Sequence, residues 1–195
     1  MNWRMPALAR LGLVFLLTLP FVANAAEIKI FTTRAVATVL EKIGPDFERE
    51  TGHKLNVTSD IAIRMVRRIQ AGEPFDVLVA APGQVDGLIK DGKIVAETRT
   101  NLVRSGIGVQ VRAGATSELV AKGDIELGMV IIAQILTTPG VELVGPLPPE
   151  IQSYITFTAG VGTNSSAPGA ARDLLKFLSG PAAIPVIRSQ GMEPG

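Results

Sequence analysis

The sequence of 195 residues contains no cysteine and a single histidine. The absence of cysteine excludes thiol nucleophiles, disulfide frameworks and cysteine-ligated zinc. One imidazole also excludes a multi-histidine metal site, and a Ser-His-Asp hydrolase would have to be built on His53. This histidine lies in a predicted turn at 51–54, between a helix and a strand, so we expect a surface residue without a catalytic role.

Aromatic residues make up only 5% of the chain, and the one tryptophan, Trp3, lies near the N-terminus. Sugars and quaternary amines are usually held by stacked aromatic faces, so neither is an expected ligand. The 19 basic and 18 acidic residues nearly balance. Such a mixture gives no electrostatic footprint for nucleic acid or for an anionic membrane surface, and we expect no nucleic-acid partner.

The first 25 residues have the pattern of a secretory signal peptide. Arg4 and Arg10 form a basic start, residues 11–22 are apolar, and Ala23-Asn24-Ala25 is a small-x-small cleavage site. The apolar run contains Pro20 and is far shorter than the roughly 20 residues that cross a bilayer, which argues against a membrane anchor. Cleavage after residue 25 would remove both arginines and change the net charge from +1 to −1. Because no cysteine is left for lipid attachment, we expect a free periplasmic protein.

Downstream of residue 26, short apolar runs alternate with helical patterns, which is typical of βαβ units on a parallel sheet. The expected strands are 28–31, 55–57, 75–80, 107–111, 127–130, 141–144 and 154–161, and the expected helices include 36–47, 61–69, 85–89, 117–122, 131–135, 167–178 and 181–190. Gly44-Pro45 should kink or restart the first helix. The order of elements predicts an α/β protein.

Several ordered motifs extend over nearly all of residues 27–195. They lie at 69–79, 118–128, 139–148, 153–154, 159–161, 177–178 and 191–194. Together they resemble the molybdate-binding-protein-like family of periplasmic solute-binding proteins. The resemblance implies a type II periplasmic-binding-protein fold with mixed sheets, in which two lobes joined by two crossing strands close on a ligand. Lobe 1 would comprise residues 26–104 and 155–195, and lobe 2 residues 105–154.

The resemblance also implies a function. Members of the family serve as soluble receptors of ABC importers and hand an oxyanion such as molybdate or tungstate to a membrane permease. We therefore expect a monomer that binds a small anion without chemistry and needs no cofactor or metal. Some relatives bind organic acids, and aconitate isomerase is similar to this group. An isomerase of a tricarboxylic acid, which needs a base at the substrate's carbon, is thus an alternative. Asp124 and Glu126 are conceivable as its acid and base, but we expect both to face solvent.

The chain departs from the family directly after Ala115. There, residues 112–115 run into 116–119, whereas relatives carry a longer insert that supplies much of lobe 2. The remaining lobe 2, residues 105–154, lies at the lower edge of domain sizes and buries proportionally little surface. We therefore predict an internal shortening with a reduced second lobe, and a remnant that binds nothing is a further alternative.

Three candidate ligand-binding residues follow the first predicted strand, at the carboxyl edge where open α/β sheets bind ligands. Thr32 and Thr33 are either hydroxyl donors to an anion or plain helix N-caps. Arg34 would pair with a carboxylate or an oxyanion, or lie exposed in the first turn of the helix.

Two further candidates lie elsewhere in the chain. Ser59, together with Asp60, should cap the second helix and can also donate to a ligand, although Asp60 would repel an oxyanion there. Tyr154 lies at the second crossing segment, where its phenol would close over the ligand or brace the hinge. Arg64, Arg67 and Arg68 form a basic helix face that is either solvated or docks a permease.

Overall fold

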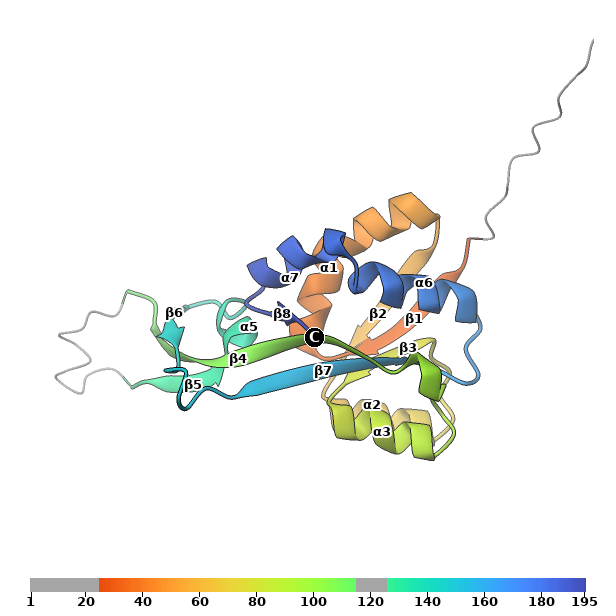
Figure 1. Ribbon diagram of the computed structural model, residues 1–195, viewed down its shortest axis with the longest axis horizontal. Helices are drawn as coiled ribbons and strands as arrows, with labels where there is room; N and C mark the ends of the chain where they lie inside the picture. Colours follow the sequence, from red (N-terminus) through yellow and green to blue (C-terminus); the bar gives the residue numbers. More distant parts are fainter. Residues whose placement is uncertain (1–24, 115–125) are drawn as a thin grey trace, which may run out of the picture.

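The computed structural model describes residues 25–114 and 126–195. Two long antiparallel strands, β4 (Thr100–Arg112) and β7 (Tyr154–Val161), run from a large lobe into a much smaller one (Figure 1). Residues 1–24 of the predicted signal peptide (1–25) and the predicted helix at 117–122 lie outside the described residues. Within the described ranges, no helix is both long enough and apolar enough to cross a membrane.

A mixed sheet forms the centre of the large lobe. Its strands are β2 (Lys54–Ser59), β1 (Glu27–Thr32), β3 (Val77–Ala80), β7 and β4, in that order. Strand β1 pairs in parallel with β2 and with β3, whereas β7 pairs antiparallel with β3 and with β4. The short strand β8 (Glu193–Pro194) adds to the other edge of β4.

Helices cover both faces of this sheet (Figure 1). On one face lie α1 (Arg34–Thr51), α6 (Pro168–Leu178), a 3-10 turn at Pro181–Ala183 and α7 (Ile184–Ser189). On the other face lie α2 (Ala62–Gln70) and α3 (Pro82–Lys90), followed by a 3-10 turn at Ala96–Thr98. The helical periodicity of the sequence produces this layering, because each helix buries one apolar stripe against the sheet.

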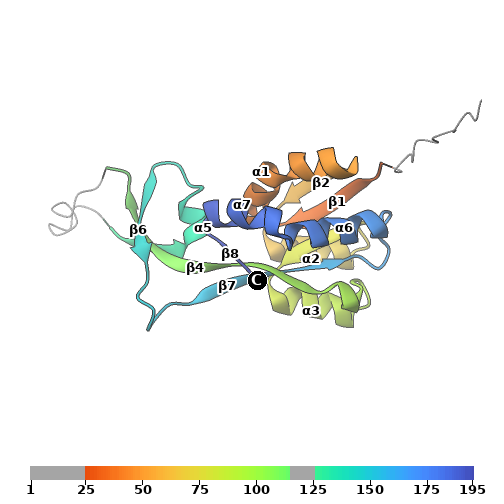
Figure 2. The same cartoon turned by 45° about the horizontal axis from the view of Figure 1, so that its top comes forward.

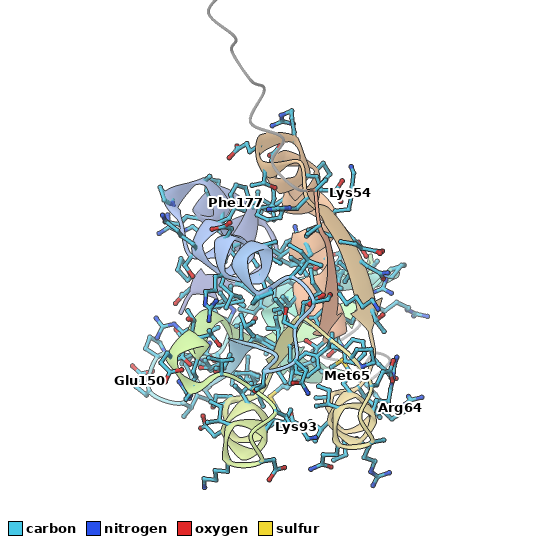
Figure 3. The ribbon with its side chains drawn as sticks, turned by 90° about the vertical axis from the view of Figure 1, so that its right-hand side faces the viewer. Lys54, Arg64, Met65, Lys93, Glu150 and Phe177 are labelled. Atoms are coloured by element: carbon cyan, nitrogen blue, oxygen red, sulfur yellow. The ribbon has the colours of Figure 1, made fainter. Side chains whose placement is uncertain are left out.

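Successive side chains of a strand point to opposite faces of the sheet, so the hydrophobic core has two parts, one on each face. In β1, Ile28 and Ile30 point toward the α1 side, whereas Phe31 packs among residues of α2 and α3. In α2, Met65 is fully buried and Arg64 is exposed, and Figure 3 shows them on the inner and outer sides of that helix. The helical periodicity of 61–69 predicts a buried stripe of Ile61, Met65 and Ile69; Met65 and Ile69 are buried, whereas Ile61 is 55% exposed.

Helix α1 is continuous through Pro45. The expected restart at Gly44-Pro45 does not occur, although Figure 1 shows that the helix changes direction part-way along its length. Proline removes one N–H from the helix and its ring crowds the preceding turn, which explains a bend without a break. The bend keeps Ile43 and Phe47 buried in the core of the large lobe.

The described part of the small lobe consists of three strands and one turn of helix. The far half of β4 pairs with β5 (Gly128–Ile131) and with β6 (Val141–Pro146), and α5 (Ile132–Ile135) covers one face. A side chain at Gly108 would come within 2.8 Å of both Ile132 and Leu143, so glycine allows α5 to lie close to β4. The second lobe is reduced, as predicted.

The two lobes are in direct contact through α5. The hydroxyl of Ser105 donates to the carbonyl of Gly191 (2.9 Å) and accepts from the N–H of Ala133 (3.2 Å). Ala133 is fully buried and belongs to the core of the large lobe. Figure 2 shows α5 beside α7 and β8. Helix α5 is therefore held against the C-terminal segment of the large lobe.

The strand pairing also continues from one lobe into the other. Ser105 and Gly106 of β4 pair with Ile155 and Tyr154 of β7. Two residues before β7 begins, the side chain of Gln152 accepts from the backbone N–H of Ile107 (2.8 Å) and donates to the backbone carbonyl of the same residue (3.0 Å). The predicted lobe boundaries, at 104/105 and 154/155, fall inside β4 and at the start of β7 and remain predictions.

A buried carboxylate, Asp76, joins β1, β3 and the start of α6. Its two oxygens accept from the backbone N–H of Lys29 (2.8 Å), from the Ser165 hydroxyl (2.6 Å), and from the N–H groups of Ser166 and Ala167 (2.8 and 3.2 Å). Burial raises the pKa of this carboxyl, but the hydrogen bonds lower it by more, so its pKa lies below the usual 3.8. Asp76 thus satisfies the backbone N–H groups of the two residues that precede α6.

Candidate functional site

The junction between β1 and α1 places Thr32 and Thr33 at the carboxyl end of a strand and the N-terminus of a helix. Thr33 is the N-cap residue, and its carbonyl accepts from the N–H groups of Val36 and Ala37 (3.1 and 2.9 Å). Its hydroxyl makes no capping bond. The predicted N-cap position is therefore right. The threonine hydroxyl, however, does not accept the hydrogen bond from a first-turn N–H that is typical of such a cap.

Both threonine hydroxyls are hidden from solvent. The Oγ1 atoms of Thr32 and Thr33 have no hydrogen-bond partner among the described residues. A buried hydroxyl without a partner costs about 1–3 kcal/mol, and such groups in native proteins usually have a functional or solvent partner. The first turn of a helix also offers free N–H groups and the positive end of the helix dipole. Within the part of the chain that the structure describes, this junction therefore presents two buried threonine hydroxyls without a partner.

A cavity of about 530 Å³ lies between the lobes, next to this junction. We call it the inter-lobe cavity. Its walls are Thr33, Arg34, Ala35, Ile131, Gln134, Thr137, Thr138, Pro139 and Phe157. The volume falls within the range of small-molecule sites. One wall comes from the start of α1 and the other from α5 and the loop after it, so closure of this cavity depends on the reduced second lobe.

A second cavity, of about 510 Å³, extends from the same junction toward α2. We call it the α2 cavity. Its walls are Thr33, Arg34, Ser59, Asp60, Ile61 and Ala62. Thr33 and Arg34 line both cavities, so the two meet at the N-terminus of α1. The structure thus brings together three of the predicted ligand-binding residues, Thr33, Arg34 and Ser59, while Thr32 is buried directly behind them.

Arg34 is exposed in the first turn of α1. The ion pairs within the described residues do not include it. Its guanidinium is therefore available to a ligand in either cavity, where a planar fork of donors suits a carboxylate or another oxyanion.

The loop before α2 differs from the prediction. The N-cap residue is Ile61, not Ser59 or Asp60, and it has no side-chain cap. The carboxylate of Asp60 instead accepts from the N–H of Ile61 (2.7 Å) and pairs with Nε of Arg64 (3.2 Å). The N–H of Asp60 donates to the carbonyl of Thr32 (3.1 Å), which ties this loop to the end of β1. Ser59 is exposed at the end of β2, two residues before the N-cap of the helix.

Tyr154 does not line either cavity. Its side chain is 45% exposed, and the Arg104 guanidinium lies 4.6 Å from the centre of its ring. Arg104 in turn pairs with Glu193 of β8 at 2.7 Å. The Tyr154 ring therefore contacts Arg104 on a surface of the crossing strands that is not part of either cavity. This position does not support the predicted role over the ligand.

The remaining candidates lie apart from the cavities. His53 accepts from the N–H of Ala26 (3.2 Å) and packs against Phe47, which is a structural role. Arg68 lies over the Phe31 ring and pairs with Glu73, whose pKa this hydrogen bond lowers.

Glu126 is exposed, and Asp124 lies outside the described residues. Within the described ranges, no three histidine or carboxylate side chains gather as the ligands of a metal ion would.

The sequence did not indicate the wall that α5 contributes. Gln134, Thr137 and Thr138 enter the inter-lobe cavity because a short helix ends there, and Phe157 of β7 lies in the same cavity. Two threonines followed by a proline, directly after a one-turn helix, were the available signal. Without knowledge of how α5 folds back on β4, this signal could not be assigned to the site.

The family model of the bacterial extracellular solute-binding proteins matches residues 28–119 and 115–193. The chain belongs to this family. Its fold is similar to that of a domain named as the substrate-binding domain of a molybdenum ABC transporter from Clostridium difficile, at 14% identity and a TM-score of 0.74 over 88% of this chain and 100% of that one. The periplasmic molybdate-binding protein of Azotobacter vinelandii gives 16% and 0.70, over 86% and 99%. The predicted family and the two-lobed fold are thereby confirmed.

A curated relative, an aconitate isomerase from a Pseudomonas species, is 22% identical over 255 residues, covering 98% of this chain and 97% of its own. An alignment of 255 residues exceeds the 195 of this chain, so the relative has residues without a counterpart here. The two family matches meet at residues 115–119. An internal shortening after Ala115 produces this pattern.

Proposed function

We propose that this protein binds a small anion where the two cavities meet, at the N-terminus of α1, and serves as the binding component of an ABC importer. The observation that carries the proposal is Thr33: the residue lines both cavities, and its hydroxyl is hidden from solvent and lacks a partner among the described residues. An anion there would accept from this hydroxyl, from the first-turn N–H groups and from Arg34.

The expected affinity comes from donors of different kinds. The helix dipole contributes about 0.3–1 kcal/mol to an anion at its N-terminus, and hydrogen bonds to a charged group are worth about 1.5–3 kcal/mol each. Arg34 can supply two such bonds to a single carboxylate or oxyanion. The inter-lobe cavity adds the polar groups of Gln134, Thr137 and Thr138 from the second lobe. Ligand contact with both lobes supports a role for the reduced second lobe in binding.

The family supports the proposed partner, a membrane permease, and the proposed compartment, the periplasm. The matching relatives are an extracellular family and periplasmic or transporter-associated binding domains, which supports a periplasmic protein delivered by the N-terminal signal peptide and read by a membrane permease. The ligand-binding residues in this proposal are Thr32, Thr33, Arg34 and Ser59. We propose a monomer without a cofactor.

An isomerase of a tricarboxylic acid is the second candidate, because the aconitate isomerase aligns over almost its whole length. Such a reaction moves a proton from one substrate carbon to another and needs a base beside the substrate. Among the described residues, Asp60 is the only carboxylate in the walls of the two cavities. Conversion of cis- to trans-aconitate by the purified protein, followed by proton NMR, tests this candidate, and loss of conversion in Asp60→Ala would assign the base.

A thermal-shift titration tests the binding proposal. The purified protein is heated with molybdate, tungstate, sulfate, phosphate, citrate or aconitate, since a ligand of the native state raises its Tm. We expect at least one anion to raise the Tm, and Thr33→Val to weaken that anion's binding roughly tenfold by removal of one hydroxyl. Arg34→Ala should weaken it by roughly 10–100-fold.

Matched control variants are Thr163→Val and Arg67→Ala. Both residues are exposed and line neither cavity, so both variants should bind as the unaltered protein does. An equal loss of binding in the control and site variants would contradict the proposed site. No Tm shift with any anion would contradict the proposed function and favour the non-binding remnant.

A further inference from the structure

The α2 cavity contains a carboxylate that an anion-binding site does not need. Asp60 lines this cavity together with Thr33 and Arg34. Its side chain is 23% exposed, and Oδ1 makes both the hydrogen bond with the Ile61 N–H and the ion pair with Arg64. Among the described residues, no hydrogen bond involves Oδ2. The cavity therefore offers one strong acceptor beside the donors at the start of α1.

An ionised carboxylate only accepts hydrogen bonds. A fully ionised tetrahedral oxyanion bound by Thr33 and Arg34 has no proton to give to Oδ2, and its negative charge is repelled by that of Asp60. A ligand that carries a hydrogen-bond donor next to its anionic group would instead pair with both. The residues at this end of the cavity are therefore more complementary to a mixed ligand than to a bare oxyanion.

The charges around Asp60 indicate the kind of donor. Arg64 pairs with Asp60 at 3.2 Å, and Arg34 lines the same cavity. Two guanidinium groups beside one carboxylate leave a net positive charge, which repels an ammonium group but accepts a neutral hydroxyl. The donor that suits this surrounding is therefore a hydroxyl.

The size and composition of the inter-lobe cavity indicate what else the ligand contains. The two cavities, of about 530 and 510 Å³, meet at Thr33 and Arg34. Ala35, Ile131 and Phe157 give the inter-lobe cavity an apolar wall. A tetrahedral oxyanion would occupy only the place where the cavities meet, whereas a short carbon chain can contact this wall.

Building on the proposed anion-binding function, we propose that the site selects a hydroxycarboxylate of several carbons. One carboxylate lies at the N-terminus of α1 against Thr33 and Arg34, and the hydroxyl donates to Oδ2 of Asp60. The carbon chain extends into the inter-lobe cavity, where Gln134, Thr137 and Thr138 can bind a second polar group. Asp60 is then a residue that determines specificity.

Isothermal titration with matched pairs of acids tests this assignment. The pairs are malate with succinate and citrate with tricarballylate, which differ in one hydroxyl. Aspartate, which replaces the hydroxyl of malate by an ammonium group, is the third arm, and molybdate is the fourth. We expect the hydroxyl-bearing member of each pair to bind at least roughly tenfold more tightly, as for one hydrogen bond to a charged group.

The variant Asp60→Asn tests the role of the carboxylate. Its amide oxygen can still accept from the Ile61 N–H, so the loop should keep its conformation. We expect the preference for malate over succinate to fall to within about twofold and molybdate binding to improve, because the negative charge is gone. Asp86→Asn is the matched control. Asp86 pairs with Arg99 at 2.6 Å on α3, outside both cavities, so its variant should keep the preference.

The possible outcomes distinguish a failure of the hydroxycarboxylate assignment from a failure of the proposed anion-binding function. Equal binding of malate and succinate, or an unchanged preference in Asp60→Asn, would overturn the hydroxycarboxylate assignment while anion binding stands. Tighter binding of aspartate than of malate would overturn the choice of a hydroxyl. Failure of every acid and of molybdate would overturn the anion-binding function itself. If Asp60→Asn does not fold, the preference measured on the unaltered protein decides.

Discussion

Asp76→Asn should destabilise the protein more than any surface change of the same size. Asp76 is 1% exposed, and its carboxylate accepts hydrogen bonds from both sides. Oδ2 faces the N–H of Lys29, and Oδ1 faces the donors of residues 165–167. An asparagine has only one acceptor oxygen, so its NH₂ group must point at one of these two sets of donors.

The expected loss follows from this geometry. Each hydrogen bond to a charged group contributes about 1.5–3 kcal/mol, and a buried donor left without an acceptor costs about 1–3 kcal/mol more. If the amide oxygen stays on the side of residues 165–167, the Lys29 N–H alone is lost. We therefore expect a decrease of about 2–4 kcal/mol in the free energy of unfolding, which is roughly 5–15 °C in Tm for a chain of this size.

Urea unfolding followed by circular dichroism measures this loss, and its pH dependence is a second test. Because the pKa of folded Asp76 lies below 3.8, its contribution is complete above that pH and is lost as the pH falls through the lower folded value. The difference in stability between the unaltered protein and the variant should therefore shrink at acid pH. A loss below about 0.5 kcal/mol, the size of an ordinary surface substitution, would refute the reasoning.

Two further predictions concern the lobe contact and the crossing strands. Gly191→Ala should lower the free energy of unfolding by about 1–3 kcal/mol, measured by thermal denaturation, because Gly191 has φ 69° and an added Cβ would lie 2.7 Å from Ile132. Unchanged stability would mean that α5 moves away easily. Tyr154→Phe should leave the Kd for any bound anion unchanged in isothermal titration, because the phenol contacts Arg104 and lines neither cavity. A tenfold weaker affinity would restore its predicted role.

The elements of the large lobe were predictable because each buries a regular apolar pattern. Strand β7 begins and ends at the predicted residues, and α2 buries Met65 and Ile69 of its predicted stripe but not Ile61. Strand β4 is longer than predicted, since its first half begins with the polar pair Thr100-Asn101. Pairing with β7 on one side extends this strand, and sequence periodicity does not report such long-range pairing.

The candidate site was predictable only where it follows from a general rule. Thr33 and Arg34 were found because ligands bind at the carboxyl ends of strands in open α/β sheets. Whether the Thr33 hydroxyl caps its own helix depends on a side-chain rotation that the sequence does not determine. The contribution of α5 depends on a contact between residues far apart in the chain. For Tyr154, the sequence left two roles open, over the ligand or at the hinge, and the observed contact with Arg104 lies outside both cavities.

The pairing of β4 with β7 across the lobe boundary has a consequence for how the protein unfolds. Ser105 and Gly106 pair with β7, and the Gln152 side chain completes the hydrogen bonds of Ile107. Because Ala133 is also part of the large core, the small lobe cannot detach without breaking that core. We expect a single calorimetric transition, and the slowest amide hydrogen exchange should extend along β4 through Ile107. We therefore expect the two lobes visible in the shape of the molecule to unfold as one cooperative unit.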